Sequence, residues 1–228
     1  MEKILKVTVS LGIEDLKITG QAVGKEELHA LLEIANPLIS AKTLYKVSYI
    51  DQKLDNTVII DGIRFQSRVL KKNLEKAERV FPYVVTIGPA LERKIEEGTD
   101  LIEKYYLDII GNIALVKARK YLEDHLCSQF ALTGLSFMSP GSLADWPIEE
   151  QSPLFSVLNR AEEWIGVTLT ENLLMVPTKS VSGIYFPTEV SFYSCQLCPH
   201  EKCEGRKAPY DQNLANKYQM GAETHAQR

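Results

Sequence analysis

Apolar positions alternate with polar ones in several short stretches, a pattern typical of half-buried strands. Residues 7–18 predict a strand, a turn at 12–15 and a second short strand. The alternation at 46–50 and 56–60 predicts a β-hairpin, which residues 63–66 extend. A β-branched run at 83–87, ended by Gly-Pro, predicts a buried strand.

Other stretches repeat their apolar residues every three or four positions, as amphipathic helices do. Residues 24–35 predict a helix that ends before a proline, and a second helix is expected over 37–45. Helical spacing returns at 67–80, 90–97 and 101–126, and the last of these predicts a long helix with a core-facing side.

The pattern becomes irregular at residues 136–147, a stretch longer than a simple connector needs. A short helix is expected next, around residues 154–158, and then short strands over 165–170, 173–176 and 181–186. From about residue 207 the chain is polar, and we expect a mobile tail with nothing to dock it.

Composition narrows the functional classes. With 228 residues and 45% hydrophobic residues, the chain can form one large domain or two small ones. A net charge of −4 with interleaved signs argues against a nucleic-acid partner. The amino terminus lacks the apolar core of a signal peptide and no segment resembles a membrane span, so we expect a cytoplasmic protein.

Three of the four cysteines, Cys195, Cys198 and Cys203, lie within nine residues. This spacing suits a soft metal, either zinc or an iron–sulfur cluster. Both usually take four protein ligands, so the fourth is expected from Cys127, His200 or a partner chain, unless one position stays open. The alternative is a set of reduced thiols in a surface loop.

Three segments in order, residues 138–147, 165–172 and 177–186, resemble the reactivation domain of cobalamin-dependent methionine synthase. Residues 86–88 and 107–111 resemble small stand-alone members of that family, so the resemblance covers about 30–190. It implies an α+β fold with a twisted antiparallel sheet flanked by helices. It also implies a domain that presents S-adenosylmethionine to oxidised cobalamin on a partner.

Carried over to this chain, the resemblance assigns a cofactor pocket to seven residues: Pro140, Gly141, Ser180, Val181, Ser182, Gly183 and Tyr185. The alternative for these residues is a glycine turn and ordinary sheet packing. Where the family has an arginine, a tyrosine and an acid, this chain has Phe137, Ser142 and Val116. Because these cannot pair with the charges of S-adenosylmethionine, weak binding or none is expected.

The resulting expectation is an accessory protein of corrinoid-dependent methyl transfer, whose partner is a corrinoid protein or methionine synthase. The alternatives are a non-catalytic metal-binding module and an S-adenosylmethionine-binding enzyme with a rearranged pocket. Whether the chain is an enzyme, and its oligomeric state, are left open. The expected division is one α+β domain over 1–190, a metal-binding segment over 191–206 and the tail over 207–228.

We also expect residues 136–146 and a turn at 180–183 to line one cleft that meets the corrinoid protein. In this interpretation Asp145 and Trp146 are exposed contact residues whose replacement leaves the fold intact.

Overall fold

A computed structural model describes residues 2–16, 24–200, 202–203 and 205–218. The chain forms two compact units. The first contains Met1–Lys46, Tyr83–Ala131 and Leu158–Ser182, and the second contains Val47–Pro82, Leu132–Val157 and Gly183–Arg228. Residues 1–190, predicted as one domain, therefore contribute to both units.

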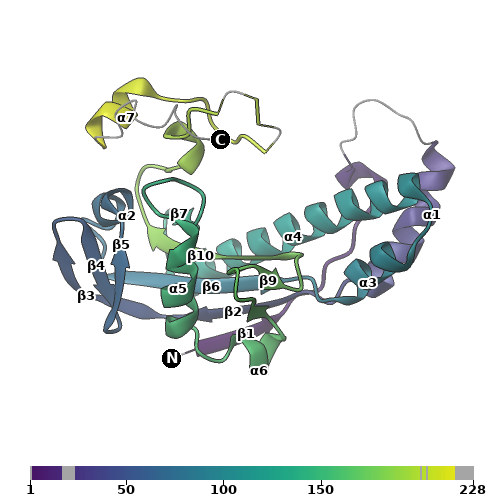
Figure 1. Cartoon of the computed structure of the whole chain (residues 1–228), viewed down its shortest axis with the longest axis horizontal. Helices are drawn as coiled ribbons and strands as arrows, with labels where there is room; N and C mark the ends of the chain where they lie inside the picture. The colour runs from purple at the N-terminus through teal and green to yellow at the C-terminus, as the bar shows by residue number, and fades with distance from the viewer. Residues whose placement is uncertain (1, 17–23, 201, 204, 219–228) are drawn as a thin grey trace. The chain divides into compact units, whose positions relative to one another are not determined.

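The first unit holds an antiparallel set of strands (Figure 1). Strand β1 (Glu2–Lys6) pairs with β2 (Lys42–Lys46), and β2 pairs in turn with the second half of β6 (Arg79–Thr86). The predicted helix over 37–45 is wrong, because only a 3₁₀ turn at Asn36–Leu38 precedes β2. Alternating Thr43 and Tyr45 suit a pleated, packed strand better than a helix.

Three helices of the first unit begin and end close to where their apolar spacing predicts: α1 (Lys25–Ala35), α3 (Ala90–Glu97) and α4 (Leu101–Phe130). A short helix that the spacing did not predict, α6 (Ala161–Ile165), occurs later in the chain. The Asp100 carboxylate accepts hydrogen bonds from the first backbone N–H groups of α4, and Ala131 ends the helix in a left-handed conformation. Two short strands, β8 (Thr168–Leu169) and β9 (Met175–Val176), pair with each other.

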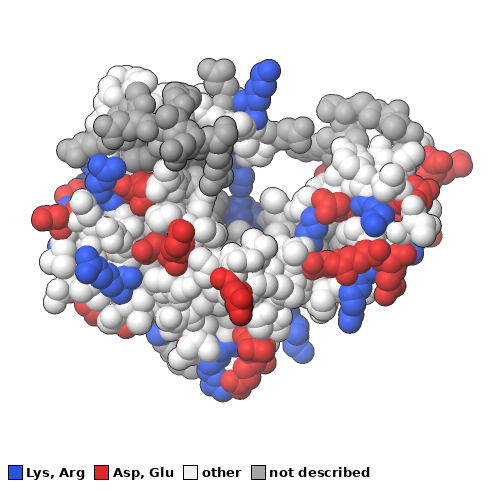
Figure 2. Space-filling model, viewed as in Figure 1, with Lys and Arg blue, Asp and Glu red and all other residues white. Residues whose placement is uncertain are grey.

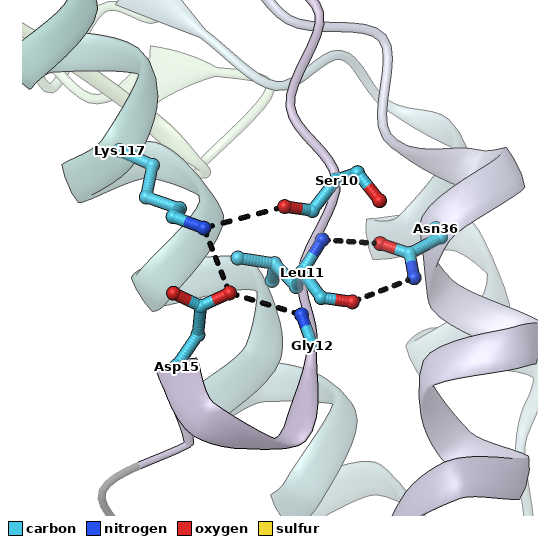
Figure 3. Close-up of polar contacts among 6 residues, drawn as sticks. All are labelled: Ser10, Leu11, Gly12, Asp15, Asn36 and Lys117. Atoms are coloured by element: carbon cyan, nitrogen blue, oxygen red, sulfur yellow. Dashed lines mark hydrogen bonds and ion pairs between the residues drawn. The ribbon is translucent and has the colours of Figure 1, made fainter.

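Side chains hold the segment after β1 against the helices of this unit (Figure 3). The Asn36 side chain both donates to the Leu11 carbonyl and accepts from its N–H, at 3.1 and 3.0 Å. Lys117 Nζ lies 2.7 Å from Asp15, and this hydrogen bond, with one from the Gly12 N–H, lowers the pKa of Asp15. The strand predicted to begin at residue 7 is wrong, because β1 ends at Lys6 and a 3₁₀ turn (Ile13–Asp15) follows. Of its expected second strand, residues 17–18 lie outside the described residues.

The second unit contains the predicted hairpin, which is confirmed as β3 (Ser48–Leu54) and β4 (Thr57–Ile60). Strand β5 (Ile63–Gln66) continues the meander beside β4, and β3 pairs with the first half of β6. The helix predicted over 67–80 is shorter, since α2 (Arg68–Asn73) ends before β6 begins.

The remaining elements of this unit come from the carboxy-terminal part of the chain. Strand β7 (Leu135–Met138) pairs with the second half of β10 (Ser180–Pro187), and α5 (Gln151–Val157) follows a 3₁₀ turn at Ile148–Glu150. Beyond β10 come a 3₁₀ turn at Ser194–Gln196 and α7 (Gln212–Lys217). The predicted α+β class, with antiparallel strands and flanking helices, is confirmed.

Each unit buries its own large apolar side chains. Those of the first include Leu44, Tyr45, Tyr83, Val84, Ile110 and Leu122, and those of the second include Phe65, Leu70, Leu74, Met138 and Trp146. The buried strand predicted at 83–87 is confirmed, because all of its residues are buried.

Lysine and arginine alternate with acidic side chains over the face in Figure 2, and no basic stripe crosses the residues drawn there. Among the helices that the structure describes, none is long and apolar enough to cross a membrane.

Candidate functional site

Strands β7 and β10 position the first group of predicted site residues. Their antiparallel register sets Tyr185 opposite Phe137 and Ile184 opposite Met138. Tyr185 is fully buried, and its ring centroid lies 5.6 Å from that of Phe137. This aromatic pair is part of the sheet packing.

The loop after β7 contains Pro140, which is buried, and Gly141, which is exposed. Gly141 has φ +79°, and a Cβ there would lie 3.1 Å from Ile148 Cδ1. Its N–H donates to the Trp146 carbonyl at 2.8 Å. A glycine is therefore required here by backbone conformation and close packing, whether or not a ligand binds.

Asp145 ties the same loop to the start of α2. Its carboxylate accepts hydrogen bonds from Ser67 Oγ (2.6 Å), the Val69 N–H (2.9 Å) and Arg68 Nε (2.9 Å). Burial acts to raise the pKa of Asp145, but these three hydrogen bonds outweigh it and the pKa is lowered. The Asp145 side chain is only 5% exposed.

Trp146 is fully buried and packs edge-on against Phe65, with 6.4 Å between ring centroids. Its indole N–H points to Glu150 Oε2 at 3.4 Å. The expectation that Asp145 and Trp146 are exposed contact residues is therefore wrong. An apolar ring of this size and a three-fold hydrogen-bonded carboxylate are worth more to the fold when buried.

The segment predicted as a turn at 180–183 is instead the beginning of β10. Ser180 and Ser182 are buried and Val181 is half-buried, all three in the first unit, whereas Gly183 belongs to the second. The Ser180 hydroxyl is buried without a hydrogen-bond partner. A polar ligand atom that formed a hydrogen bond with the Ser180 hydroxyl would satisfy it.

A polar cluster on α4 was missed by the sequence analysis. Lys179 Nζ lies 2.6 Å from Asp108 Oδ1 and 2.8 Å from Asn112 Oδ1. Gly111 lets the Lys179 side chain lie close to α4, since a Cβ there would lie 3.4 Å from Lys179 Cε and 3.2 Å from Leu91 Cδ2. In the sequence, the glycine at position 111 within a predicted helix is the sign of this close approach. One turn further along α4, Val116 is 53% exposed.

The cysteine segment, residues 192–207, makes two tight turns. In the first, the Cys198 N–H donates to the Cys195 carbonyl at 3.3 Å, and in the second the Arg206 N–H donates to the Cys203 carbonyl at 3.2 Å. Leu197, between the first two cysteines, is buried. All four cysteines of the chain are free thiols.

Arg206 holds the two turns together. Its guanidinium donates to the carbonyls of Cys195 (3.0 Å), Cys198 (3.1 Å) and Ala208 (3.2 Å), and also to that of His200. A planar group with five donors can serve several carbonyls at once. Arg206 could not be recognised from the sequence, because a single arginine in a polar stretch carries no pattern.

This geometry does not support the predicted metal centre. Within residues 2–16, 24–200, 202–203 and 205–218, no three His, Cys, Asp or Glu side chains are grouped so that they could hold a metal ion. Cys195 and Cys198 are half-buried, whereas Cys203 is exposed in the other turn. The group that binds the backbone carbonyls here is the Arg206 guanidinium, and the described residues do not bring Cys195, Cys198 and Cys203 together as a three-ligand group.

The cysteine segment packs on the loop after β7. The Phe192 N–H donates to Ser136 Oγ at 2.8 Å, and Ser142 Oγ lies 3.4 Å from Ser194 Oγ. Lys207 Nζ lies 5.5 Å from the centroid of the Phe137 ring. Phe137 and Ser142, the positions that depart from the family, therefore contact this chain's own carboxy-terminal segment.

Part of the chain beyond Lys207 packs on the second unit, although the sequence predicts a tail without contacts. Ala215 of α7 is fully buried, and Tyr218 Oη donates to Asn73 Oδ1 at 2.7 Å. The Tyr218 ring stacks on Phe192 with centroids 5.9 Å apart. The premise that nothing docks the tail is wrong for residues 211–218, and residues 219–228 lie outside the described part.

Comparison with known proteins gives one family and one fold. Residues 138–207 match the family described as vitamin B12 dependent methionine synthase, activation domain. The match includes the cysteine segment and so extends beyond residue 190, where the predicted resemblance ended. No curated protein sequence matches the chain.

Among solved structures, the chain is similar to one described as the MetH reactivation domain bound to AdoHcy, at 15% identity and a TM-score of 0.58. The similarity covers 85% of this chain and 80% of that one. The predicted resemblance is thus confirmed as a similarity: residues 138–207 match the activation-domain family of vitamin B12 dependent methionine synthase, and the fold is like that of the MetH reactivation domain.

Proposed function

We propose that this chain is an accessory protein of corrinoid-dependent methyl transfer in the cytoplasm. Its partner would be a corrinoid protein, or a methionine synthase that lacks its own reactivation domain. The observation that supports this role is the unbroken family match over residues 138–207, which includes the loop after β7, strand β10 and the cysteine segment. The proposal does not depend on a metal bound to the cysteines.

S-adenosylmethionine fits the described residues only in part. The unpaired Ser180 hydroxyl could receive a polar ligand atom. Of the positions that the resemblance assigns to the charged end of the ligand, however, one holds Phe137, which packs against Tyr185, and another holds the exposed apolar Val116. Each lost charge-assisted hydrogen bond costs about 1.5–3 kcal/mol, so two losses weaken binding by roughly a hundredfold or more.

Calorimetry with S-adenosylmethionine tests this inference. Wild-type protein is expected to bind weakly or not at all, and Val116→Glu to bind about tenfold more tightly, because a carboxylate can balance a cationic ligand. Val116 is exposed, so the fold should tolerate the change. Val116→Gln is the matched control and should bind like wild type. A low-micromolar dissociation constant for the wild type would contradict the inference.

Binding of a corrinoid protein tests the accessory role itself. Ala144 is exposed in the loop after β7, unlike Asp145 and Trp146, and serves as the site to perturb. Ala144→Arg should weaken association measured by calorimetry, while Gln52→Arg, an exposed change on β3, should leave it unchanged. If no corrinoid protein binds the wild type, the proposal fails.

A non-catalytic interaction module is the second candidate, favoured by the burial of most predicted pocket residues: Pro140, Ser180, Ser182, Gly183 and Tyr185. A measurement of electron transfer that depends on the corrinoid protein distinguishes the accessory protein from the non-catalytic module. An accessory protein of reactivation should accelerate return of the corrinoid to its methylated state, and a module that only binds should not.

A further inference from the structure

The first cysteine turn has the geometry of a dithiol that can close on itself. Cys195 and Cys198 are its first and fourth residues, joined by the Cys198 N–H to Cys195 carbonyl hydrogen bond. Such a turn keeps these two Cα atoms within about 7 Å. Disulfides need roughly 4.4–6.8 Å between Cα atoms, so the turn brings the pair close to the separation that a disulfide requires.

The turn is also held in place from both sides. Arg206 binds the carbonyls of Cys195 and Cys198, and buried Leu197 anchors the residue between them. The Lys207 N–H lies 3.5 Å from Cys195 Sγ and the Asp211 N–H donates to the Gln196 carbonyl at 2.9 Å. A constrained pair of thiols has a higher effective concentration for each other than the same pair in a flexible chain.

Cys203 differs from this pair. It begins the second turn, is exposed, and makes no group of three with other candidate ligands among the described residues. The three cysteines therefore divide into a constrained pair and a separate exposed thiol.

We propose that Cys195 and Cys198 are a thiol–disulfide exchange pair, with Arg206 as the residue that positions them. A thiolate of one cysteine attacks an external disulfide, forms a mixed disulfide and releases one thiol. The second cysteine then attacks that mixed disulfide, forms the Cys195–Cys198 bond and releases the other thiol. Two protein thiols are oxidised and one external disulfide is reduced to two thiols. Exchange pairs of this kind are the transient disulfides found in reducing compartments.

Equilibration with a glutathione redox buffer, followed by alkylation and mass spectrometry, tests the proposal. Wild type and Cys203→Ser should each form the internal Cys195–Cys198 disulfide. Cys195→Ser and Cys198→Ser should stop at a mixed disulfide with glutathione. In urea the internal disulfide of the wild type should be about tenfold less favoured, because the turn is lost.

Arg206→Ala should likewise lower the equilibrium constant for the internal disulfide about tenfold, with Lys202→Ala, an exposed change in the same segment, as control. The proposal is overturned if both thiols stay reduced when the unfolded chain oxidises, or if Cys203 is the preferred partner. Metal held by all three cysteines in anaerobically purified protein, shown by metal and sulfide analysis, would also overturn it. None of these outcomes depends on a corrinoid partner, so this proposal and the accessory role fail separately.

Discussion

Two stretches of the second unit, the loop at residues 139–150 and the cysteine segment at 192–207, are held by different kinds of contact. In the loop, side chains make the contacts that hold it in place: the Asp145 carboxylate binds the start of α2, and the Trp146 ring is buried in the core. In the cysteine segment, one side chain, that of Arg206, binds backbone carbonyls while the thiols stay unbridged.

The difference shows where each stretch can carry a function. Replacing the central residues of the loop should destabilise the fold, so we expect a binding surface there to use exposed positions such as Ser142 and Ala144. The cysteine segment can change its thiol chemistry with little effect on the core, because the backbone is held independently of the sulfur atoms. Perturbing both stretches in parallel makes this contrast measurable.

Trp146→Ala should give the largest effect. Removing a fully buried tryptophan costs about 3–5 kcal/mol in the free energy of unfolding, because a large cavity remains. Urea denaturation measures the change. Trp164→Ala is the control, since that ring is only partly buried under Arg160 and its loss should cost under about 1.5 kcal/mol. Equal losses at both positions would contradict the core role of Trp146.

Asp145→Asn should cost about 2–3 kcal/mol, because a neutral amide cannot accept the three hydrogen bonds in the same way. The pKa of Asp145 is lowered on folding from its usual 3.8, so its contribution is complete above that pH and is lost as the pH falls through the folded-state value. The difference in the free energy of unfolding between wild type and Asp145→Asn should therefore become smaller on acidification below about pH 4.

Denaturation at several pH values measures this difference. Asp55→Asn, at an exposed position, should change the free energy of unfolding by less than about 0.5 kcal/mol at every pH. A difference for Asp145→Asn that does not depend on pH would show that the carboxylate charge is not what ties the loop to α2.

Tyr218→Phe removes the hydrogen bond to Asn73 that docks Tyr218, the residue directly after α7. The expected loss is about 1 kcal/mol in the free energy of unfolding, together with faster proteolysis of the carboxy-terminal segment. Tyr210→Phe, at an exposed tyrosine, is the control. No change in proteolysis would mean that ring stacking on Phe192 is enough to hold Tyr218.

Arg206→Ala should have the smallest global effect, under about 1 kcal/mol, because the segment can open locally while the core stays folded. Hydrogen exchange should nevertheless become faster at the amides of Cys198 and Arg206, which close the two cysteine turns. Arg206→Lys keeps the charge but not the fork of donors, and should restore only part of the protection. Unchanged hydrogen exchange in Arg206→Ala would show that Arg206 does not hold the two cysteine turns together.

Local periodicity predicted much of the fold, because α1, α3, α4 and the β3–β4 hairpin each carry a clear apolar repeat. The site was harder to predict, since its contacts join residues far apart in sequence. Asp145 reaches α2 across 76 positions, and nothing local distinguishes it from an exposed acid. The spacing of the cysteines likewise does not show how their turns are held. That depends on Arg206, whose guanidinium reaches the Cys195 and Cys198 carbonyls only in the folded chain.

Addition of this chain to a purified corrinoid protein tests its proposed role most directly. The absorption spectrum of the inactive corrinoid should change on addition, saturate at one chain per corrinoid protein, and change less with Ala144→Arg than with Gln52→Arg. An unchanged spectrum, with no co-migration of the two proteins, would contradict the proposed role.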